Sequence, residues 1–234
     1  MPLYFQAVAG ASALMSGALI LPIAITQSCS GIVCGFIIRK TGRYLEPIWV
    51  GMAVMTLGFG LFVDLSTNFS LAKIVTFQLI GGLGVGLVFQ SPLIALQSLV
   101  APENMATATA TFGFVRNIGC SMSIVLGGVL FQNGMETHST AREAAVGHDI
   151  AYKFSGGGAG ANVGLVSGLE GGQRDVVRAA YTSRLREMWI LYACTAAMGL
   201  VASAFIGKQS LAAPQGDADT KRRSNEDLEL QVRE

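Results

Sequence analysis

The side chains in this sequence that could bind a ligand are a few amides and one guanidinium set inside long apolar runs. Gln90 and Gln97 share one run, Gln27 lies in an earlier run, and Arg116 with Asn117 lies deep in a later one. A charge in the middle of a membrane span costs about 2.5–3.5 kcal/mol by insertion scales, and such residues are usually functional. We therefore interpret these five side chains as candidates for lining a substrate path.

Catalytic and metal-binding chemistry has no comparable support. The four cysteines lie inside apolar runs without metal-ligand spacing, and we interpret them as buried small residues. No Asp, Glu or His lies in the middle of an expected membrane helix, so a membrane enzyme finds no acid, base or nucleophile set there. The net charge of +1, without a basic patch, also disfavours nucleic acid as a partner. We expect no enzymatic activity, no cofactor and no metal site.

The composition predicts an all-α integral membrane protein with the lipid bilayer as its surroundings. The 234 residues are 51% hydrophobic and 13% charged, whereas soluble domains carry about 25% charged residues. Five apolar stretches are long enough to cross the ~30 Å hydrocarbon core of a bilayer. The expected helices are residues 12–38 (interrupted by Pro22), 47–63, 73–100, 105–131 and 188–206.

The positions of basic residues in short loops predict the orientation. Arg39, Lys40 and Arg43 follow the first expected helix, and Lys208 with residues 221–223 follows the last. Five crossings place both of these ends on one side, which the positive-inside rule makes cytosolic. We therefore expect the N-terminus outside and the C-terminus in the cytosol.

Two segments fall outside the expected helices. Residues 1–208 are expected to form one transmembrane region and residues 209–234 a disordered cytosolic tail. The outer loop 132–187 mixes six basic and six acidic residues with glycine clusters. Its parts near 140–153 and 174–186 have helical composition, and we expect them to lie along the membrane surface.

Two of the expected helices carry a small or polar face backed by an apolar one. In helix 105–131 this face spans about 80° and consists of Thr109, Gly113, Arg116, Cys120, Ser123 and Gly127. In helix 73–100 the corresponding arc of about 120° holds Gln78, Gly82, Gly86, Gln90 and Gln97. Gln78 lies near the outer end, where it could simply be an interfacial residue.

Each polar stripe has a structural interpretation beside the functional one. The spacings Gly31-x-x-x-Gly35 and Gly82-x-x-x-Gly86 more often indicate close helix packing than substrate contact. For Arg116 two interpretations stay open: it lines a polar cavity, or it pairs with backbone carbonyls where two helices meet.

Three sets of residues resemble the major facilitator superfamily, especially its fungal-type fourteen-helix drug:proton antiporter branch. The first, Gly35-x-x-x-Arg39-x-x-Gly42-Arg43, has the spacing of the family's cytosolic loop motif, with Arg39 where the motif has an acid. The others are Tyr4–Val8 with Ser12–Gly17 and Leu21-Pro22, and Gly82 to Gln97 followed by Ala106 to Gly119. The likeness covers residues 1–207.

The resemblance implies a C-terminal portion of a transporter, the last five helices of fourteen. It implies a secondary active transporter that exports small, mostly apolar molecules (a drug, toxin or secondary metabolite) by alternating access. Such a portion is expected to require an N-terminal helical bundle, since alternating access rocks one bundle against another. We favour the plasma membrane over the vacuolar membrane. The alternative is a truncated, non-transporting membrane remnant or scaffold.

Overall fold

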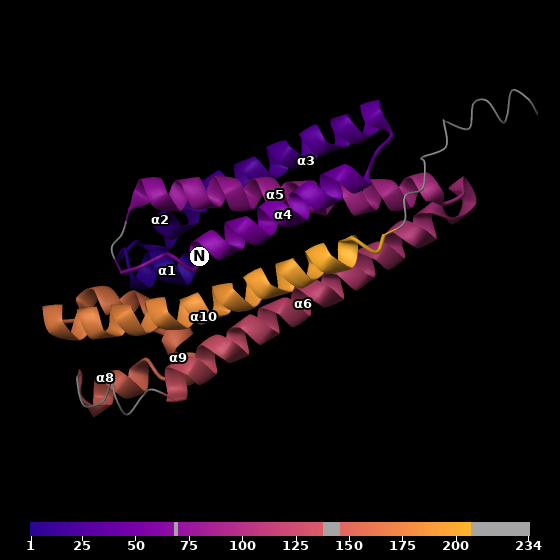
Figure 1. Ribbon diagram of the computed structural model, residues 1–234. Helices are drawn as coiled ribbons and strands as arrows, with labels where there is room; N and C mark the ends of the chain where they lie inside the picture. The colour runs from indigo at the N-terminus through magenta and orange to yellow at the C-terminus, as the bar shows by residue number, and fades with distance from the viewer. Residues whose placement is uncertain (68–69, 138–145, 207–234) are drawn as a thin grey trace, which may run out of the picture.

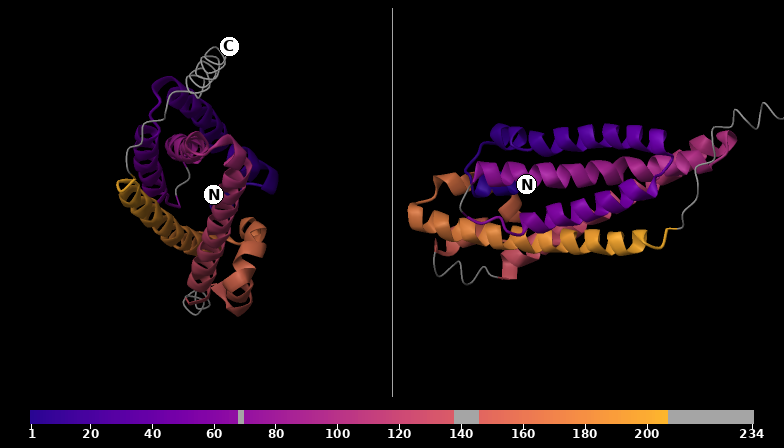
Figure 2. Two further views of the ribbon diagram at one scale, coloured as in Figure 1. Left: turned by 90° about the vertical axis from the view of Figure 1, so that its right-hand side faces the viewer. Right: turned by 45° about the horizontal axis from the view of Figure 1, so that its top comes forward.

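Five long helices run along a common axis in the computed structural model, which describes residues 1–67, 70–137 and 146–206 (Figures 1 and 2). They are α3 (Leu21–Thr41), α4 (Leu45–Phe62), α5 (Leu71–Leu99), α6 (Met105–Thr137) and α10 (Gly171–Ser203). The shorter elements are α1 (Pro2–Ala7), α2 (Ala13–Ala18), α8 (His148–Lys153), α9 (Gly156–Ala161) and the 3₁₀ turns η1 (Pro102–Asn104) and η2 (Val163–Gly168). Five helical segments, α2 and α3 counted together, are long and apolar enough to cross a membrane, which confirms the predicted fold class.

The largest departure from the expected boundaries is in the outer loop 132–187. The last long helix begins at Gly171 rather than at 188, and α6 continues to Thr137. The prediction that 174–186 lies along the membrane surface is therefore wrong. This stretch continues the last span because Val177, Tyr181 and Leu185 repeat every four residues and are all buried, as is Trp189. The expected tail 209–234 and part of 140–153 lie outside the described residues.

The first span is broken close to Pro22, as its sequence predicts. Pro22 has no N–H for the carbonyl of Ala18 four residues earlier, and the chain breaks between α2, which ends at Ala18, and α3, which begins at Leu21. The carbonyl of Leu19 lies in this break, where it needs a partner from another helix. Gln78 of α5 supplies it, because its Nε2 donates to that carbonyl oxygen over 2.9 Å and its side chain is fully buried. An unpaired carbonyl in apolar surroundings costs several kcal/mol, so Gln78 stabilises the break and is not an interfacial residue.

Glycines of α5 allow two neighbouring helices to approach its backbone. A Cβ atom at Gly84 would collide with the backbone of Met55 in α4. On another side of α5, a Cβ at Gly82 would lie 2.7 Å from the carbonyl oxygen of Ile23 in α3. Gly82 and Gly84 lie about 200° apart around the helix axis, at 100° per residue. The helices α3 and α4 can therefore pack closely against different sides of α5 at nearly the same level.

The long helices pack as a row in the order α3, α5, α4, α10 and α6, and the row curves so that α6 also contacts α5. The helices at the ends of the row keep broad exposed faces, with Phe36 of α3 68% exposed and Val125 of α6 62% exposed. At one end of the bundle, Nε1 of Trp49 donates to the carbonyl oxygen of Ser203 over 3.0 Å. The start of α4 therefore lies beside the end of α10, which places the basic segment after α3 at the same end as the end of α10.

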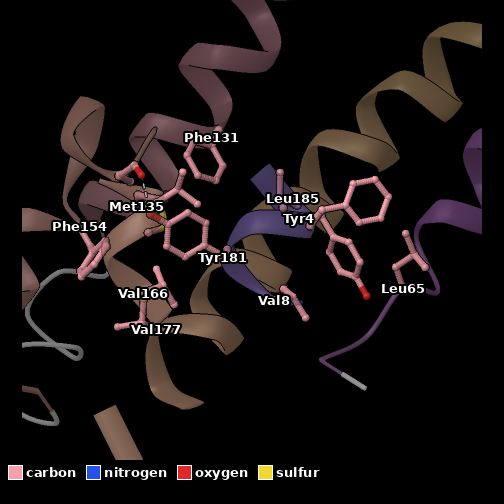
Figure 3. Close-up of a cluster of buried hydrophobic side chains, with 14 of the residues drawn as sticks. Tyr4, Val8, Leu65, Phe131, Met135, Phe154, Val166, Val177, Tyr181 and Leu185 are labelled. Atoms are coloured by element: carbon pink, nitrogen blue, oxygen red, sulfur yellow. Dashed lines mark hydrogen bonds between the residues drawn. The ribbon is translucent and has the colours of Figure 1, made fainter. Parts of the chain in front are cut away.

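The opposite end of the bundle carries a packed cap built from α1, α8, α9, η2 and the first half of α10. Figure 3 shows Tyr181 among buried side chains, and its hydroxyl donates to the carbonyl oxygen of Ala159 over 2.5 Å. Its ring centroid lies 5.8 Å from that of Phe131 and 6.2 Å from that of Phe154. On α1, the Tyr4 hydroxyl donates to the carbonyl oxygen of Ser66 over 2.8 Å. The described part of the outer loop thus contributes to a hydrophobic core that it shares with α1 and the neighbouring ends of the long helices.

Two glycines one turn apart on α5 give a matched test of the close packing. We expect Gly84→Ala to lower the unfolding free energy in detergent by about 1–3 kcal/mol, because the added Cβ meets the backbone of α4, which cannot yield as a side chain would. Gly81→Ala is the control, since its Cβ would meet the Phe62 ring at 3.5 Å and Cδ1 of Ile23 at 4.0 Å, both ordinary contacts with side chains. Thermal unfolding of both variants is the measurement, and equal stability would contradict the packing described.

Two aromatic residues of the cap give a second test. Phe154 is 1% exposed, whereas Tyr152 two positions earlier is 77% exposed. Phe154→Ala should destabilise the cap by about 3–5 kcal/mol through the cavity it leaves. We expect trypsin to cleave after Lys153 much faster in that variant, while Tyr152→Ala should be cleaved at the rate of the unmodified chain. Similar cleavage of all three proteins would show that the cap has no such core.

Candidate functional site

The close approach of α3 to α5 leaves a cleft immediately beside it. Gly86 faces α3 so tightly that a Cβ there would collide with Ser30 Oγ and with the carbonyl oxygen of Gln27. Ser30 is buried, and its hydroxyl donates to that same carbonyl oxygen over 3.1 Å. The cleft that opens next to this contact has a volume of about 230 Å³. Its lining consists of Gln27, Ser28, Gly31, Ile32, Gly86, Phe89 and Gln90.

Two of the amides singled out from the sequence meet in this cleft. Gln27 comes from α3 and Gln90 from α5, and both are half-buried. Each amide offers two N–H donors and one acceptor oxygen, and the described residues give neither side chain a hydrogen-bond partner. The pair can therefore bind the carbonyl or hydroxyl groups of a small molecule.

Arg116 of α6 lies next to the cleft through its contact with Phe89. Its guanidinium carbon lies 4.3 Å from the centre of the Phe89 ring and 5.9 Å from that of Phe112, one turn earlier on α6. A desolvated cation–π contact is worth about 2 kcal/mol, comparable to the ~2.5–3.5 kcal/mol cost of a charge in mid-span. The partners that the structure shows for Arg116 are thus aromatic rings and not backbone carbonyls, and the interpretation that it borders a polar cavity stays a prediction.

The other two path candidates lie apart from the cleft. Gln97 is near the end of α5, where its Nε2 lies 3.5 Å from the hydroxyl oxygen of Thr109 on α6. Asn117 is exposed on α6, and its backbone carbonyl accepts a hydrogen bond from Ser121. The structure therefore brings Gln27 and Gln90 together in the cleft, and Phe89 connects Arg116 to them. Gln97 and Asn117 lie elsewhere.

The four glycines expected to pack helices differ in how closely the neighbouring helix approaches them. Gly82 and Gly86 leave no room for a Cβ against α3, whereas Gly31 and Gly35 would place one at 3.6 and 3.8 Å from its nearest neighbour. The tight contacts are thus made by the α5 pair, and the α3 pair is in ordinary contact.

The segment expected to be the cytosolic loop motif terminates α3. Gly42 adopts φ 65°, a left-handed conformation that favours glycine, and its N–H donates to the carbonyl oxygen of Ile38 over 2.8 Å. Arg43 forms an exposed ion pair with Glu46 at 2.9 Å, and Arg39 is exposed in the last turn of the helix. These residues shape the turn between α3 and α4.

Sequence reasoning missed the aromatic residues of the site. Phe89 directly precedes Gln90, and Phe112 precedes Arg116 by four positions, which puts it on the same face of α6. A search for rings four positions away from a cation within an apolar run could have found Phe112. A second cleft of about 410 Å³ was also not foreseen; Met52, Met55, Phe59, Ser123, Tyr192, Thr195 and Ala196 line it between α4, α6 and α10. Across residues 1–67, 70–137 and 146–206, no three His, Cys, Asp or Glu side chains gather as they would around a metal ion.

Comparison with known proteins relates the chain to transporters. It is 44% identical over 211 residues to the MFS-type transporter ppz2 of Metarhizium majus and 40% identical over the same length to the efflux pump dotC of Dothistroma septosporum. Both alignments cover 90% of this chain and 36% of the relative. An MFS-type transporter of Aspergillus terreus is 39% identical over 197 residues, or 84% of this chain and 36% of that protein. The chain thus spans about a third of the length of these curated relatives. No model of a protein family and no solved structure matches it.

A double-mutant cycle tests the contact that holds Arg116. We expect Phe89→Leu and Arg116→Gln to be coupled by about 1–2 kcal/mol in unfolding free energy, because either change removes the same cation–π contact. Phe114 provides the control, since it is 65% exposed and forms no described contact with Arg116. A cycle with Phe114→Leu should give coupling near zero, and equal coupling in both cycles would contradict the geometry.

Proposed function

The chain belongs to the major facilitator superfamily, and on that premise we propose that it is the C-terminal part of a secondary active transporter. Its proposed role is the export of small, mostly apolar molecules by alternating access. The observation that carries the proposal is the cleft in which Gln27 and Gln90 face each other beside Phe89 and Arg116.

The cleft has the chemistry that a transport site for such molecules requires. Ile32 and Phe89 offer apolar surface, and two amides offer a few hydrogen bonds that fix the orientation of a ligand. Gln90 lies 19 residues from the start of the 29-residue helix α5, which places the cleft well within the span and away from both membrane surfaces. A polar cleft at that depth supports binding of a substrate in transit.

The arrangement of the ends supports the proposed orientation. The cap and the basic segment after α3 lie at opposite ends of the bundle, so the positive-inside rule assigns the basic end to the cytosol and the cap to the outside. The face of α6 that carries Arg116 and Cys120 is the surface to which a second, N-terminal bundle would pack. We propose the plasma membrane as the site of action.

Export by cells tests the proposal. The chain is expressed alone and together with the first two thirds of the Metarhizium majus relative, and export of a fluorescent apolar dye is measured. We expect export only from the pair. Gln90→Leu in the pair should slow it by about tenfold, since a polar group of the substrate then loses its partner.

Gln132→Leu is the matched control, because Gln132 is exposed on the last turns of α6 toward the cap. It should export at the unmodified rate. A pair that inserts in the membrane but exports nothing would favour the non-transporting scaffold, and full export by Gln90→Leu would remove the cleft from the transport path.

A further inference from the structure

We infer that the site selects aromatic acids, that is, flat conjugated molecules with an anionic oxygen group at one edge, which Arg116 binds beside Phe89. The inference rests on the proposed function and names the substrate class of that same site. It is carried by three features of the structure: the charge at the site, the available hydrogen-bond donors of the guanidinium, and the Phe89 ring, which both lines the cleft and contacts the guanidinium.

The charge of the site favours anions over cations. None of the seven residues that line the cleft is ionisable, and Arg116 is the charged side chain that contacts one of them, Phe89. Among the residues that the structure describes, no carboxylate pairs with this guanidinium. A positive charge held in mid-span without a carboxylate attracts an acidic ligand and repels a basic one.

The aromatic contacts leave the hydrogen-bond donors of Arg116 available. Phe89 and Phe112 contact the guanidinium through their π-systems, which occupy no N–H group. Within the described part of the chain, no oxygen accepts a hydrogen bond from Arg116. The planar group carries five N–H donors in a fork that matches a carboxylate with two parallel bonds. Arg116 lies about 16 Å along α6 from its first residue, a position that favours a ligand within the span over a lipid headgroup as its anion.

The aromatic part of the ligand follows from the position of Phe89. This side chain lines the cleft, contacts Arg116, and is 45% exposed, so part of its surface remains open to a ligand. A flat molecule that packs on the open part of Phe89 and on Ile32 would reach the guanidinium with a group that extends past the ring, while Gln27 and Gln90 bind further carbonyl or hydroxyl groups. A conjugated acid satisfies all of these groups at once.

Binding of a matched pair of probes tests the inference. The full chain is placed in nanodiscs of neutral lipid, and dissociation constants are measured for 2-naphthoate and for 2-naphthamide, which has the same shape without the charge. Empty nanodiscs correct for partitioning into lipid. We expect the acid to bind about tenfold more tightly than the amide, as a charge-assisted pair of hydrogen bonds implies.

Variants separate the contribution of Arg116 from that of the cleft. Arg116→Gln should weaken the acid about tenfold and leave the amide unchanged, and Phe89→Leu should weaken both, because it removes the shared ring. Arg186→Gln, the same change at an exposed position of the cap, should alter neither. If Arg116→Gln does not fold, the difference in affinity between the acid and the amide on the unmodified chain still tests the inference.

The outcomes distinguish the two proposals. Equal binding of acid and amide, or equal loss of both in Arg116→Gln, would overturn the assignment of aromatic acids while leaving a transport site in place. If neither probe binds while the dye of the export assay is still transported, the assignment of aromatic acids would also be overturned. Absence of both binding and export would count against the proposed function itself.

Discussion

The structure depends on the close approach of two helices to the backbone of α5. Gly84 allows α4 to touch that backbone, and Gly82 and Gly86 allow α3 to do so from another side. In lipid there is no hydrophobic force between helices, so packing at small residues and interhelical hydrogen bonds must hold them. Gln78 adds such a bond by pairing with the free carbonyl of Leu19. These contacts make α3, α5 and α4 one layer from which the rest of the bundle extends.

The candidate site is a consequence of this layer. Because Gly86 brings α5 against α3 at Gln27, the cleft beside this contact is lined by Gln27 of α3 and by Gln90, one turn after Gly86 on α5. Phe89 then connects the cleft to α6 by holding Arg116. The exposed apolar residues of α3 and α6 suit lipid, while the face of α6 that carries Arg116 and Cys120 suits a water-filled path or a second bundle.

The sequence could predict the parts that depend on composition and spacing. Long apolar runs located the five spans, Pro22 located the break, and glycine spacing located the surfaces between helices. It could not predict contacts set by which helices meet, so Phe89 was not recognised as the partner of Arg116. The cap was missed because the residues of its core, such as Phe154 and Tyr181, are scattered among charges and glycines. The amide of Gln78 looked interfacial because its partner lies 59 residues away.

The central claim, that the Arg116 face of α6 borders a watery path while other exposed faces contact lipid, can be measured with the protein's own thiols. Cys120 lies one turn from Arg116, about 40° around the helix, whereas Cys194 of α10 lies well away from the buried stripe of Trp189 and Ala196. Both cysteines are exposed. In vesicles that hold chains with one of these thiols and alanine at the other cysteines, a membrane-impermeant thiosulfonate should label Cys120 quickly and Cys194 barely. Equal labelling of the two, or faster labelling of Cys194, would contradict the account.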